Sequence, residues 1–389
     1  MIFIIELKKV SKEYSRNKPV VDALDLMINQ GEFVVLIGES GCGKTTTMKM
    51  INRLIDVSKG QILIDGQDIM KMDPINLRRK IGYVIQKVGL FPHMTVGDNI
   101  EIIPKLMKWP KEKRKARAMD LLDLVGLSGE EYYDRYPSEL SGGQQQRIGF
   151  ARALAIDPDI ILMDEPFSAL DPMTREQLQN ELLKIQEELH KTIIFVTHDM
   201  DEALKLGDKI AVMKDGKILQ YASPEVILKS PVNEFVEYFV GKDRLWRSPE
   251  MVYARDIMNR KVVKVGENRS SANAIEVMKA NGVTSLAIVS QQSDKPQKIL
   301  GYVTRAELRH ATDHQIKMKD VMNTRVHVIN ESMNMLEVLN YMTNNKIQQV
   351  YVSNDEDNLT GVITETNIIN LITEISSDIG EEEKVAGDQ

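Results

Sequence analysis

Three short apolar runs rich in β-branched residues punctuate the first half of the chain. They cover residues 33–37, 160–163 and 193–197, and each ends in glycine or in polar side chains. A continuous apolar run of this length is typical of a strand that is buried on both faces. Segments with helical spacing separate the runs, so the pattern predicts an α/β fold with a parallel sheet and helices on its faces.

Residues 95–152 follow a different pattern, with apolar residues at helical spacing and few strand signals. Leu121, Leu122, Val125 and Leu127 illustrate this spacing. We interpret the segment as a helical subdomain inserted into the α/β core. The whole of this first domain is expected to cover residues 1–240.

An internal repeat fills most of the second half. The sequence DIM at residues 256–258 recurs as DVM at 320–322, and GYVT at 301–304 recurs as GVIT at 361–364. The offset falls from 64 to 60 residues, which a shortened loop explains, because loops tolerate deletions better than strands do. We therefore predict two βαββα units of α+β type. They are placed at residues 254–312 and 317–375, after a linker at 241–253 and before an acidic tail at 376–389.

The composition excludes several classes of protein. Apolar residues make up 42% of the 389 residues and charged residues 28%, which is ordinary for a folded multidomain chain. No apolar run approaches the roughly 18 residues of a membrane-spanning helix. A net charge of −7 argues against nucleic acid as a partner. The single cysteine, Cys42, precludes an internal disulfide and fits a reducing compartment.

The first apolar run leads into a glycine-rich loop and then into a helical pattern. The loop has the spacing Gly-x-x-x-x-Gly-Lys-Thr, which lets successive backbone N–H groups converge on phosphate oxygens at a helix N-terminus. Lys44 is expected to reach the β- and γ-phosphates, and Thr45 to hold Mg²⁺. The expected nucleotide contacts of this loop are Gly38, Glu39, Ser40, Gly41, Cys42, Gly43, Lys44, Thr45 and Thr46.

Two adjacent carboxylates follow the second apolar run. Asp164 is placed to bind Mg²⁺ through its water shell, and Glu165 to position and deprotonate an attacking water molecule. A solvated acidic turn at a strand end is the alternative interpretation. The phosphate loop elsewhere in the chain favours nucleotide binding and hydrolysis.

The sequence LSGGQQ at residues 140–145 resembles the signature of the ATP-binding subunits of ABC transporters. The resemblance covers residues 7–240 and implies ATP as the cofactor and a homodimer as the working form. In that dimer Ser141, Gly142, Gly143 and Gln144 would contact the γ-phosphate held by the partner's phosphate loop, at a helix N-terminus. A Ser/Gly-rich turn in which Ser141 caps a helix is compatible with the same residues.

The same resemblance assigns roles to residues outside these motifs. It implies that Tyr14 stacks on adenine and that Gln86, after a strand at 81–85, links the Mg²⁺ site to the helical subdomain. Asp171 would belong to a loop at 168–171 that communicates between paired sites, and His198 would contact the γ-phosphate. The implied catalytic residues are Lys44, Gln86, Glu165 and His198, and the implied Mg²⁺ ligands are Thr45, Gln86 and Asp164.

The two C-terminal units resemble cystathionine-β-synthase (CBS) domains, which pair into a module with clefts for adenine nucleotides. The family's ribose-binding Asp is replaced here, because Thr304 is followed by Glu307 and Thr364 by Asn367. This change disfavours simple AMP or ATP binding, and a purely structural, dimerising role stays open. The expected contacts of a regulatory nucleotide are Thr284, Thr304, Ile347, Gln348 and Thr364.

One nucleotide domain followed by two CBS repeats resembles the importers of quaternary-ammonium osmolytes such as glycine betaine, carnitine, choline and proline betaine. The resemblance implies an ATPase at the cytoplasmic face of the cell membrane. It also implies separate permease subunits and an extracytoplasmic substrate-binding protein or domain. We expect the CBS module to gate uptake through cyclic di-AMP, through ionic strength, or through both. The alternatives are a soluble ABC ATPase whose repeats only dimerise, and a nucleotide sensor without turnover.

Overall fold

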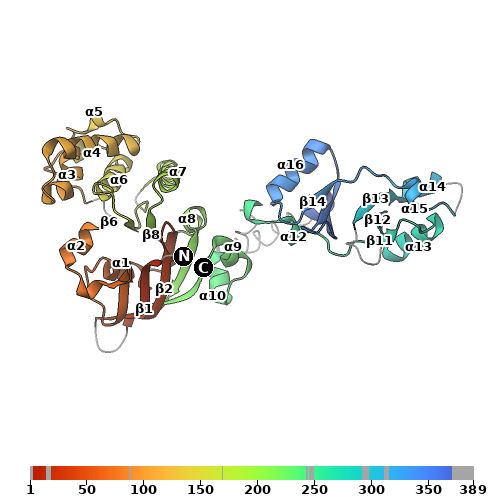
Figure 1. Ribbon diagram of the computed structural model, residues 1–389, viewed down its shortest axis with the longest axis horizontal. Helices are drawn as coiled ribbons and strands as arrows, with labels where there is room; N and C mark the ends of the chain where they lie inside the picture. The colour runs from red at the N-terminus through yellow and green to blue at the C-terminus, as the bar shows by residue number, and fades with distance from the viewer. Residues whose placement is uncertain are drawn as a thin grey trace, which may run out of the picture. The chain divides into compact units, whose positions relative to one another are not determined.

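The structure is a computed structural model of the chain, and its contacts form two compact units, Met1–Gly241 and Lys242–Gln389 (Figure 1). It describes residues 3–14, 19–86, 89–168, 170–241, 244, 249–290, 298–310 and 315–369. The predicted tail at 376–389, the second repeat beyond 369, Ala169 and most of the predicted linker before 249 lie outside these residues. Across the described ranges no helix is long and apolar enough to cross a membrane.

A six-stranded sheet forms the centre of the first unit. The three predicted runs become neighbouring parallel strands, β3 (Phe33–Gly38), β8 (Thr192–Thr197) and β7 (Ile160–Asp164), and all their residues are buried. The sheet order is β10-β9-β3-β8-β7-β6, completed by β6 (Ile81–Val84), β9 (Lys209–Lys214) and β10 (Lys217–Ala222). Only the edge pair β9–β10 is antiparallel, so the predicted α/β class is confirmed.

A second, antiparallel sheet lies beside the first and was not predicted from the sequence. Its order is β2-β1-β4-β5, with β1 (Phe3–Glu13), β2 (Pro19–Asn29), β4 (Lys59–Ile64) and β5 (Gln67–Asp68). The pairing of β1 with β2 shifts register between Leu7 and Val10, which is the behaviour of a β-bulge. Such a shift interrupts the two-residue alternation by which a half-buried strand is recognised.

Alternate residues of β3 enter two different hydrophobic cores. Val34 and Leu36 belong to a core shared with the second sheet and with helix α1 (Lys44–Ile51). Phe33, Val35 and Ile37 point into the other core, which also contains side chains of helix α7 (Pro172–Leu189). The central sheet is therefore covered on both faces, as its unbroken apolar strands require.

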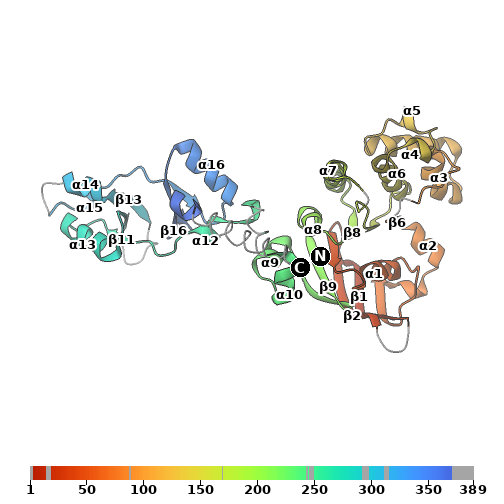
Figure 2. The same cartoon turned by 180° about the vertical axis from the view of Figure 1, so that it is seen from behind.

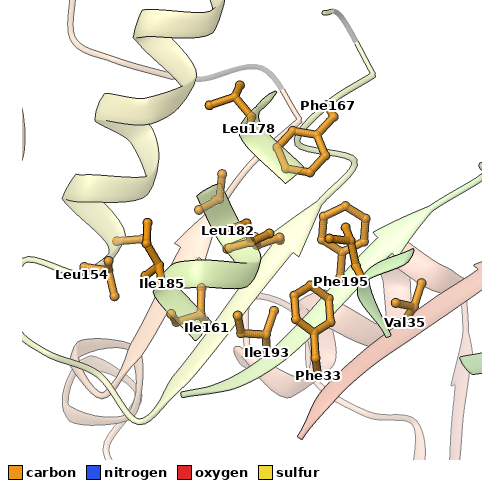
Figure 3. Close-up of a cluster of buried hydrophobic side chains, with 14 of the residues drawn as sticks. Phe33, Val35, Leu154, Ile161, Phe167, Leu178, Leu182, Ile185, Ile193 and Phe195 are labelled. Atoms are coloured by element: carbon orange, nitrogen blue, oxygen red, sulfur yellow. The ribbon is translucent and has the colours of Figure 1, made fainter. Parts of the chain in front are cut away.

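Three phenylalanines pack against one another, with tilted rings, in the second of these cores. The ring centroids of Phe33 and Phe195 are 5.8 Å apart, and those of Phe195 and Phe167 are 5.6 Å apart. Figure 3 shows these rings beside Leu178 and Leu182 of α7. Phe167 follows β7 closely, so this packing fixes the chain just beyond the Asp164–Glu165 pair.

The predicted helical insert is present and gathers on the side away from β1 and β2 in both views (Figure 2). It consists of α3 (Val96–Leu106), α4 (Lys111–Leu124), α5 (Gly129–Tyr132), the short 3₁₀ helix η2 (Pro137–Glu139) and α6 (Gly142–Ala153). The remaining helices of this unit are η1 (Ile69–Lys71), α2 (Pro74–Arg79), α8 (Met200–Leu206), α9 (Pro224–Lys229) and α10 (Glu234–Val240).

The second unit contains two three-stranded sheets of matching topology. In each, one parallel and one antiparallel pair join three strands in the order β11-β12-β13 or β14-β15-β16. The first repeat comprises η3 (Pro249–Met251), α12 (Ala254–Ile257), β11 (Lys264–Gly266), α13 (Ser271–Asn281), β12 (Ser285–Val289), β13 (Ile299–Thr304) and α14 (Arg305–His310). The second comprises α15 (Met318–Val321), β14 (Val328–Asn330), α16 (Met335–Asn345), β15 (Gln349–Ser353) and β16 (Leu359–Thr364).

The repeats interlock through the two motifs that revealed them. Met258 of the first repeat packs on Gly361 of the second, where an added Cβ would lie 2.4 Å from its sulfur. Met322 packs in the same way on Gly301, with a corresponding distance of 2.8 Å. The methionine and the glycine of each repeat therefore serve the other repeat, and this exchange explains why both motifs occur twice.

Candidate nucleotide-binding site

The predicted phosphate loop connects β3 to α1, at the carboxyl end of the central strand. Gly43 precedes α1 with φ of 109°, and a Cβ there would lie 2.8 Å from the carbonyl oxygen of Val20. A Cβ at Gly38 would lie 2.2 Å from the carbonyl oxygen of Met213. Only glycine fits at these two positions, and their backbone bends the loop around the start of α1.

Lys44 lies at the centre of this loop and is only 6% exposed. Its Nζ donates hydrogen bonds to the carbonyl oxygens of Gly38 at 2.7 Å and Glu39 at 3.0 Å. The carbonyl groups of the loop thus hold the Lys44 ammonium close to the free backbone N–H groups at the N-terminus of α1. The side chain of Glu39 is exposed, whereas Cys42 is buried, which raises the pKa of its thiol.

Thr45 and Asp164 meet across 119 residues of sequence. The Thr45 hydroxyl donates to Oδ1 of Asp164 at 2.8 Å, at the point where α1 begins and β7 ends. Burial raises the pKa of Asp164, despite the hydrogen bond from Thr45 that lowers it. A buried carboxylate beside a hydroxyl is an oxygen donor set that fits Mg²⁺, and a bound cation would offset the cost of burying this charge.

Two predicted residues converge on one oxygen of a third, Glu165. The side-chain amide of Gln86 donates to Glu165 Oε2 at 3.0 Å, and His198 Nδ1 lies 3.5 Å from the same oxygen. The backbone of Glu165 has φ of 44°, and its N–H donates to the carbonyl of Val196 at 3.0 Å. The ends of β7 and β8 are thereby joined, so the chain places a carboxylate, an amide and an imidazole at one edge of the sheet.

The Ser141 loop opens α6 with the capping geometry expected from its sequence. Ser141 Oγ accepts from the N–H of Gln144, and Gln144 Oε1 accepts from the N–H of Ser141 at 2.9 Å. A Cβ on Gly142 would meet nothing within 4 Å, whereas one on Gly143 would lie 2.6 Å from Thr174 Cγ2. The two glycines therefore differ: Gly143 packs on α7, and Gly142 presents bare backbone.

Two further predicted residues occupy the margins of this region. Tyr14 is 63% exposed, with Lys12 Nζ lying 5.2 Å from its ring centroid. Asp171 is the N-cap of α7 and accepts from the N–H of Thr174 at 3.1 Å; hydrogen bonding to the side chain and then to the backbone of Thr174 lowers the pKa of this carboxyl. Neither side chain contacts the Glu165 cluster in the described contacts, so their predicted roles stay predictions.

The five residues predicted for a regulatory nucleotide line one cleft in the second unit. This cleft has a volume of about 710 Å³ and is bordered by Thr284, Thr304, Ile347, Gln348 and Thr364. The basic residues of this cleft, Arg325, His327 and Lys346, were not predicted from the sequence. The 64-residue offset could have found the first of them, because Arg325 corresponds to Lys261 in the smaller cleft of about 270 Å³.

Glu307 and Asn367, which replace the ribose-binding Asp expected from the resemblance, form hydrogen bonds with neighbouring residues of their own repeat. The Glu307 carboxylate accepts from the backbone N–H and the hydroxyl of Thr304, at 2.7 and 2.9 Å. Asn367 is hydrogen-bonded to the Thr364 hydroxyl at 2.6 Å. Each side chain thus binds the threonine three residues before it.

Comparison with known proteins agrees with this geometry. A family model for ABC transporters matches residues 21–168, and one for CBS domains matches residues 254–314 and 318–374. The glycine betaine/carnitine/choline transport ATP-binding protein OpuCA of Bacillus subtilis is 48% identical over 95% of this chain and 96% of its own length. The osmoprotectant import ATP-binding protein OsmV of Salmonella typhimurium is 46% identical over 79% of this chain and 81% of its own.

Solved structures resemble the first unit. The protein cbiO1 of Clostridium perfringens, part of an ABC transporter complex, gives a TM-score of 0.56 at 28% identity, over 64% of this chain and 97% of its own. A dimeric ATP-binding cassette in a post-hydrolysis state with ADP and Pi gives 0.52 at 37% identity, over 57% and 98%. The 48% identity to OpuCA extends over 95% of this chain and includes both kinds of domain. The chain therefore belongs to the family of ABC transporter ATP-binding proteins that carry two C-terminal CBS domains.

Proposed function

We propose that this chain is the ATP-hydrolysing subunit of an importer for a small quaternary-ammonium osmolyte: glycine betaine, carnitine, choline or proline betaine. The observation that carries the proposal is the 48% identity to a glycine betaine/carnitine/choline transport protein over 95% of the chain. That similarity includes both the nucleotide unit and the two repeats. We assign the domains to residues 1–240, 254–312 and 317–375, joined by a linker at 241–253 and followed by the tail at 376–389.

The geometry supports a division of chemical roles in hydrolysis. Glu165 acts as the general base, because its carboxylate lies at the strand end beside Gln86 and His198, which orient it and the water molecule it deprotonates. Lys44 binds the β- and γ-phosphates in place of its loop carbonyls. Bound Mg²⁺ would neutralise charge on those phosphates, and the residues that would hold it are Thr45, Asp164 and Gln86.

We propose further that two copies of the chain close over ATP. The exposed Ser141 loop and the bare backbone of Gly142 would cover a triphosphate bound at Lys44 of the partner, while Asp171 communicates between the two sites and Tyr14 stacks on adenine. The dimeric assembly of a similar ATP-binding cassette with ADP and Pi supports this arrangement. Separate permease subunits and an extracytoplasmic binding protein complete the importer, and the chain works at the cytoplasmic face of the membrane.

ATP hydrolysis by the parent chain tests the ATPase assignment, and the variant Glu165→Gln tests the assignment of the base. It should abolish phosphate release and trap an ATP-bound dimer, because the amide keeps the shape and hydrogen bonding of the side chain but cannot accept a proton. Glu112→Gln, on the exposed face of α4, is the matched control and should hydrolyse ATP normally. Normal hydrolysis by Glu165→Gln would refute the role of this base.

Uptake tests the transport assignment. Cells grown at high osmolarity should lose accumulation of labelled glycine betaine or carnitine when this chain is removed, and regain it with the parent chain but not with Glu165→Gln. Co-purification of the chain with a polytopic membrane protein is the second expected result. Undiminished uptake without the chain, together with purification free of membrane protein, would favour a soluble ATPase whose CBS repeats only dimerise.

Regulation by cyclic di-AMP in the larger cleft is a second candidate function. The cleft is wide, and its basic residues Arg325, His327 and Lys346 suit a ligand that carries phosphates. Calorimetry of the full chain should give binding heat that falls in Arg325→Gln and survives in Lys261→Gln, the equivalent change in the smaller cleft. No heat at high micromolar ligand would remove this proposal. Uptake that still rises with salt would then assign the gating to ionic strength.

A further inference from the structure

A buried polar cluster joins α7 to α8 beside the proposed ATP site and has no role in the chemistry above. Its centre is the carboxylate of Glu202, which is 6% exposed. The Thr197 hydroxyl donates to Glu202 Oε2 at 2.6 Å, and the Gln179 amide donates to Oε1 at 3.4 Å. Burial raises the pKa of Glu202, so the chain bears a cost for this charge that ordinary packing between two helices would not require.

Arg175 of α7 connects this carboxylate to two other segments. Its Nε lies 3.9 Å from Glu202 Oε1, and its Nη1 lies 3.5 Å from Asp199 Oδ2. Its Nη2 donates to the carbonyl oxygen of Leu170 at 3.3 Å. One guanidinium therefore contacts Leu170, the N-cap residue Asp199 of α8 and the buried carboxylate of Glu202. A planar group with several donors can do this, whereas the point charge of lysine cannot.

The residues that this cluster fixes are the two neighbours of His198. Thr197 Oγ1 accepts from the N–H of Asp199 at 3.0 Å while its own proton goes to Glu202. Asp199 Oδ1 caps α8 by accepting from the N–H of Asp201 at 2.9 Å. The imidazole itself is 62% exposed, and its one described contact is the 3.5 Å approach to Glu165. Its position consequently depends on the backbone that holds it from both sides.

We propose that Arg175, which faces the buried carboxylate of Glu202, is a positioning residue that aligns His198 with Glu165 and couples this alignment to Leu170. The inference rests on the proposed ATPase function. Arg175 acts through the neighbours of His198 and is expected to affect the hydrolytic step more than nucleotide binding. A misplacement of about 1 Å at a reacting group lowers rates by up to about 100-fold, which sets the scale of the effect.

The test compares Arg175→Gln, Arg175→Lys and Glu202→Gln in the full-length chain. Arg175→Gln should lower kcat by about 10- to 100-fold while KM and the affinity for a fluorescent ATP analogue change by less than about threefold. Arg175→Lys should recover part of kcat, because it restores the charge facing Asp199 but cannot also reach Leu170. Lys298→Gln is the control, since Lys298 pairs with exposed Asp357 in the second unit, away from the nucleotide site residues.

The split between kcat and KM separates positioning from folding. A kcat within about twofold of the parent in both Arg175→Gln and Glu202→Gln would overturn the inference. So would a loss of nucleotide affinity equal to the loss of turnover. If Arg175→Gln does not fold, the isosteric Glu202→Gln decides on the same criteria. Absence of ATP hydrolysis by the parent chain would instead refute the ATPase assignment, so the two failures are distinguishable.

Discussion

Neighbouring glycines at the start of α6 should respond oppositely to the same substitution. Gly143→Ala places a methyl group 2.6 Å from Thr174 Cγ2, a distance that real contacts do not reach, so the Thr174 side chain, α6 or α7 must shift. Gly142→Ala places the same group in open space. Both changes gain the helix preference of alanine, and the difference between them isolates the packing of α6 on α7.

The expected magnitudes follow from these contacts. Overpacking by one methyl group costs about 1–3 kcal/mol, and replacement of a helical glycine by alanine returns about 0.5–1 kcal/mol. Gly143→Ala should therefore destabilise the first unit by about 1–2 kcal/mol, whereas Gly142→Ala should be neutral or slightly stabilising. Thr174→Ser removes the clashing methyl group, so in the double variant it should restore most of the loss.

Urea unfolding followed by tryptophan fluorescence measures these differences. The chain has two tryptophans, and a Trp246→Phe background leaves Trp109 of the insert as the reporter for the first unit. ATP turnover is recorded in parallel. If Gly142→Ala is stable but hydrolyses ATP slowly, the loss of activity comes from a changed contact with the nucleotide and not from unfolding. Equal stability of the two alanine variants, or no coupling between Gly143→Ala and Thr174→Ser, would refute the packing argument.

Three other predictions test the core, the buried acid and the interlocked repeats. Phe195→Ala should cost about 3–5 kcal/mol in urea unfolding, because its ring is fully buried between two others; a loss under about 1 kcal/mol would contradict this. Because the pKa of Glu202 is raised in the folded chain, folding favours its protonated form, and the parent loses stability as this carboxyl ionises. Glu202→Gln cannot ionise, so its stability relative to the parent should rise between about pH 4 and pH 8. Equal pH slopes would exclude this. Gly301→Ala and Gly361→Ala should each lower the thermal midpoint of the second unit by several degrees. Met258→Ala should relieve Gly361→Ala in part, because its Cβ stays 2.8 Å from the added methyl group, and should leave Gly301→Ala unrelieved.

The sequence sufficed wherever the chemistry requires a fixed spacing or an unbroken apolar run. β3, β7 and β8 were recognised because each is buried on both faces and reads as continuous hydrophobic sequence. The phosphate loop was recognised because its glycines are imposed by close backbone contacts, such as that of Gly43 with Val20. The repeat was recognised because its methionine and glycine motifs pack on each other.

Features set by distant residues could not be predicted in this way. β1 and β2 pair with bulges that disturb the alternation of apolar and polar side chains, so the local sequence pattern does not indicate these strands. Arg325 and Lys346 become cleft residues only when β15 and β16 assemble beside them. Arg175 and Glu202 lie 27 residues apart on different helices, and each alone has the sequence pattern of an ordinary exposed charge.

The carboxylate of Glu165 receives contacts from two segments other than the strand that it follows. Gln86 reaches Glu165 from β6, which leads toward the helical insert, and His198 reaches it from β8, which leads into the Arg175 cluster. A movement of either segment by about 1 Å would lengthen a contact to the same carboxylate oxygen. On the proposed assignment of Glu165 as the base, we expect hydrolysis at full rate only when both segments hold their positions together.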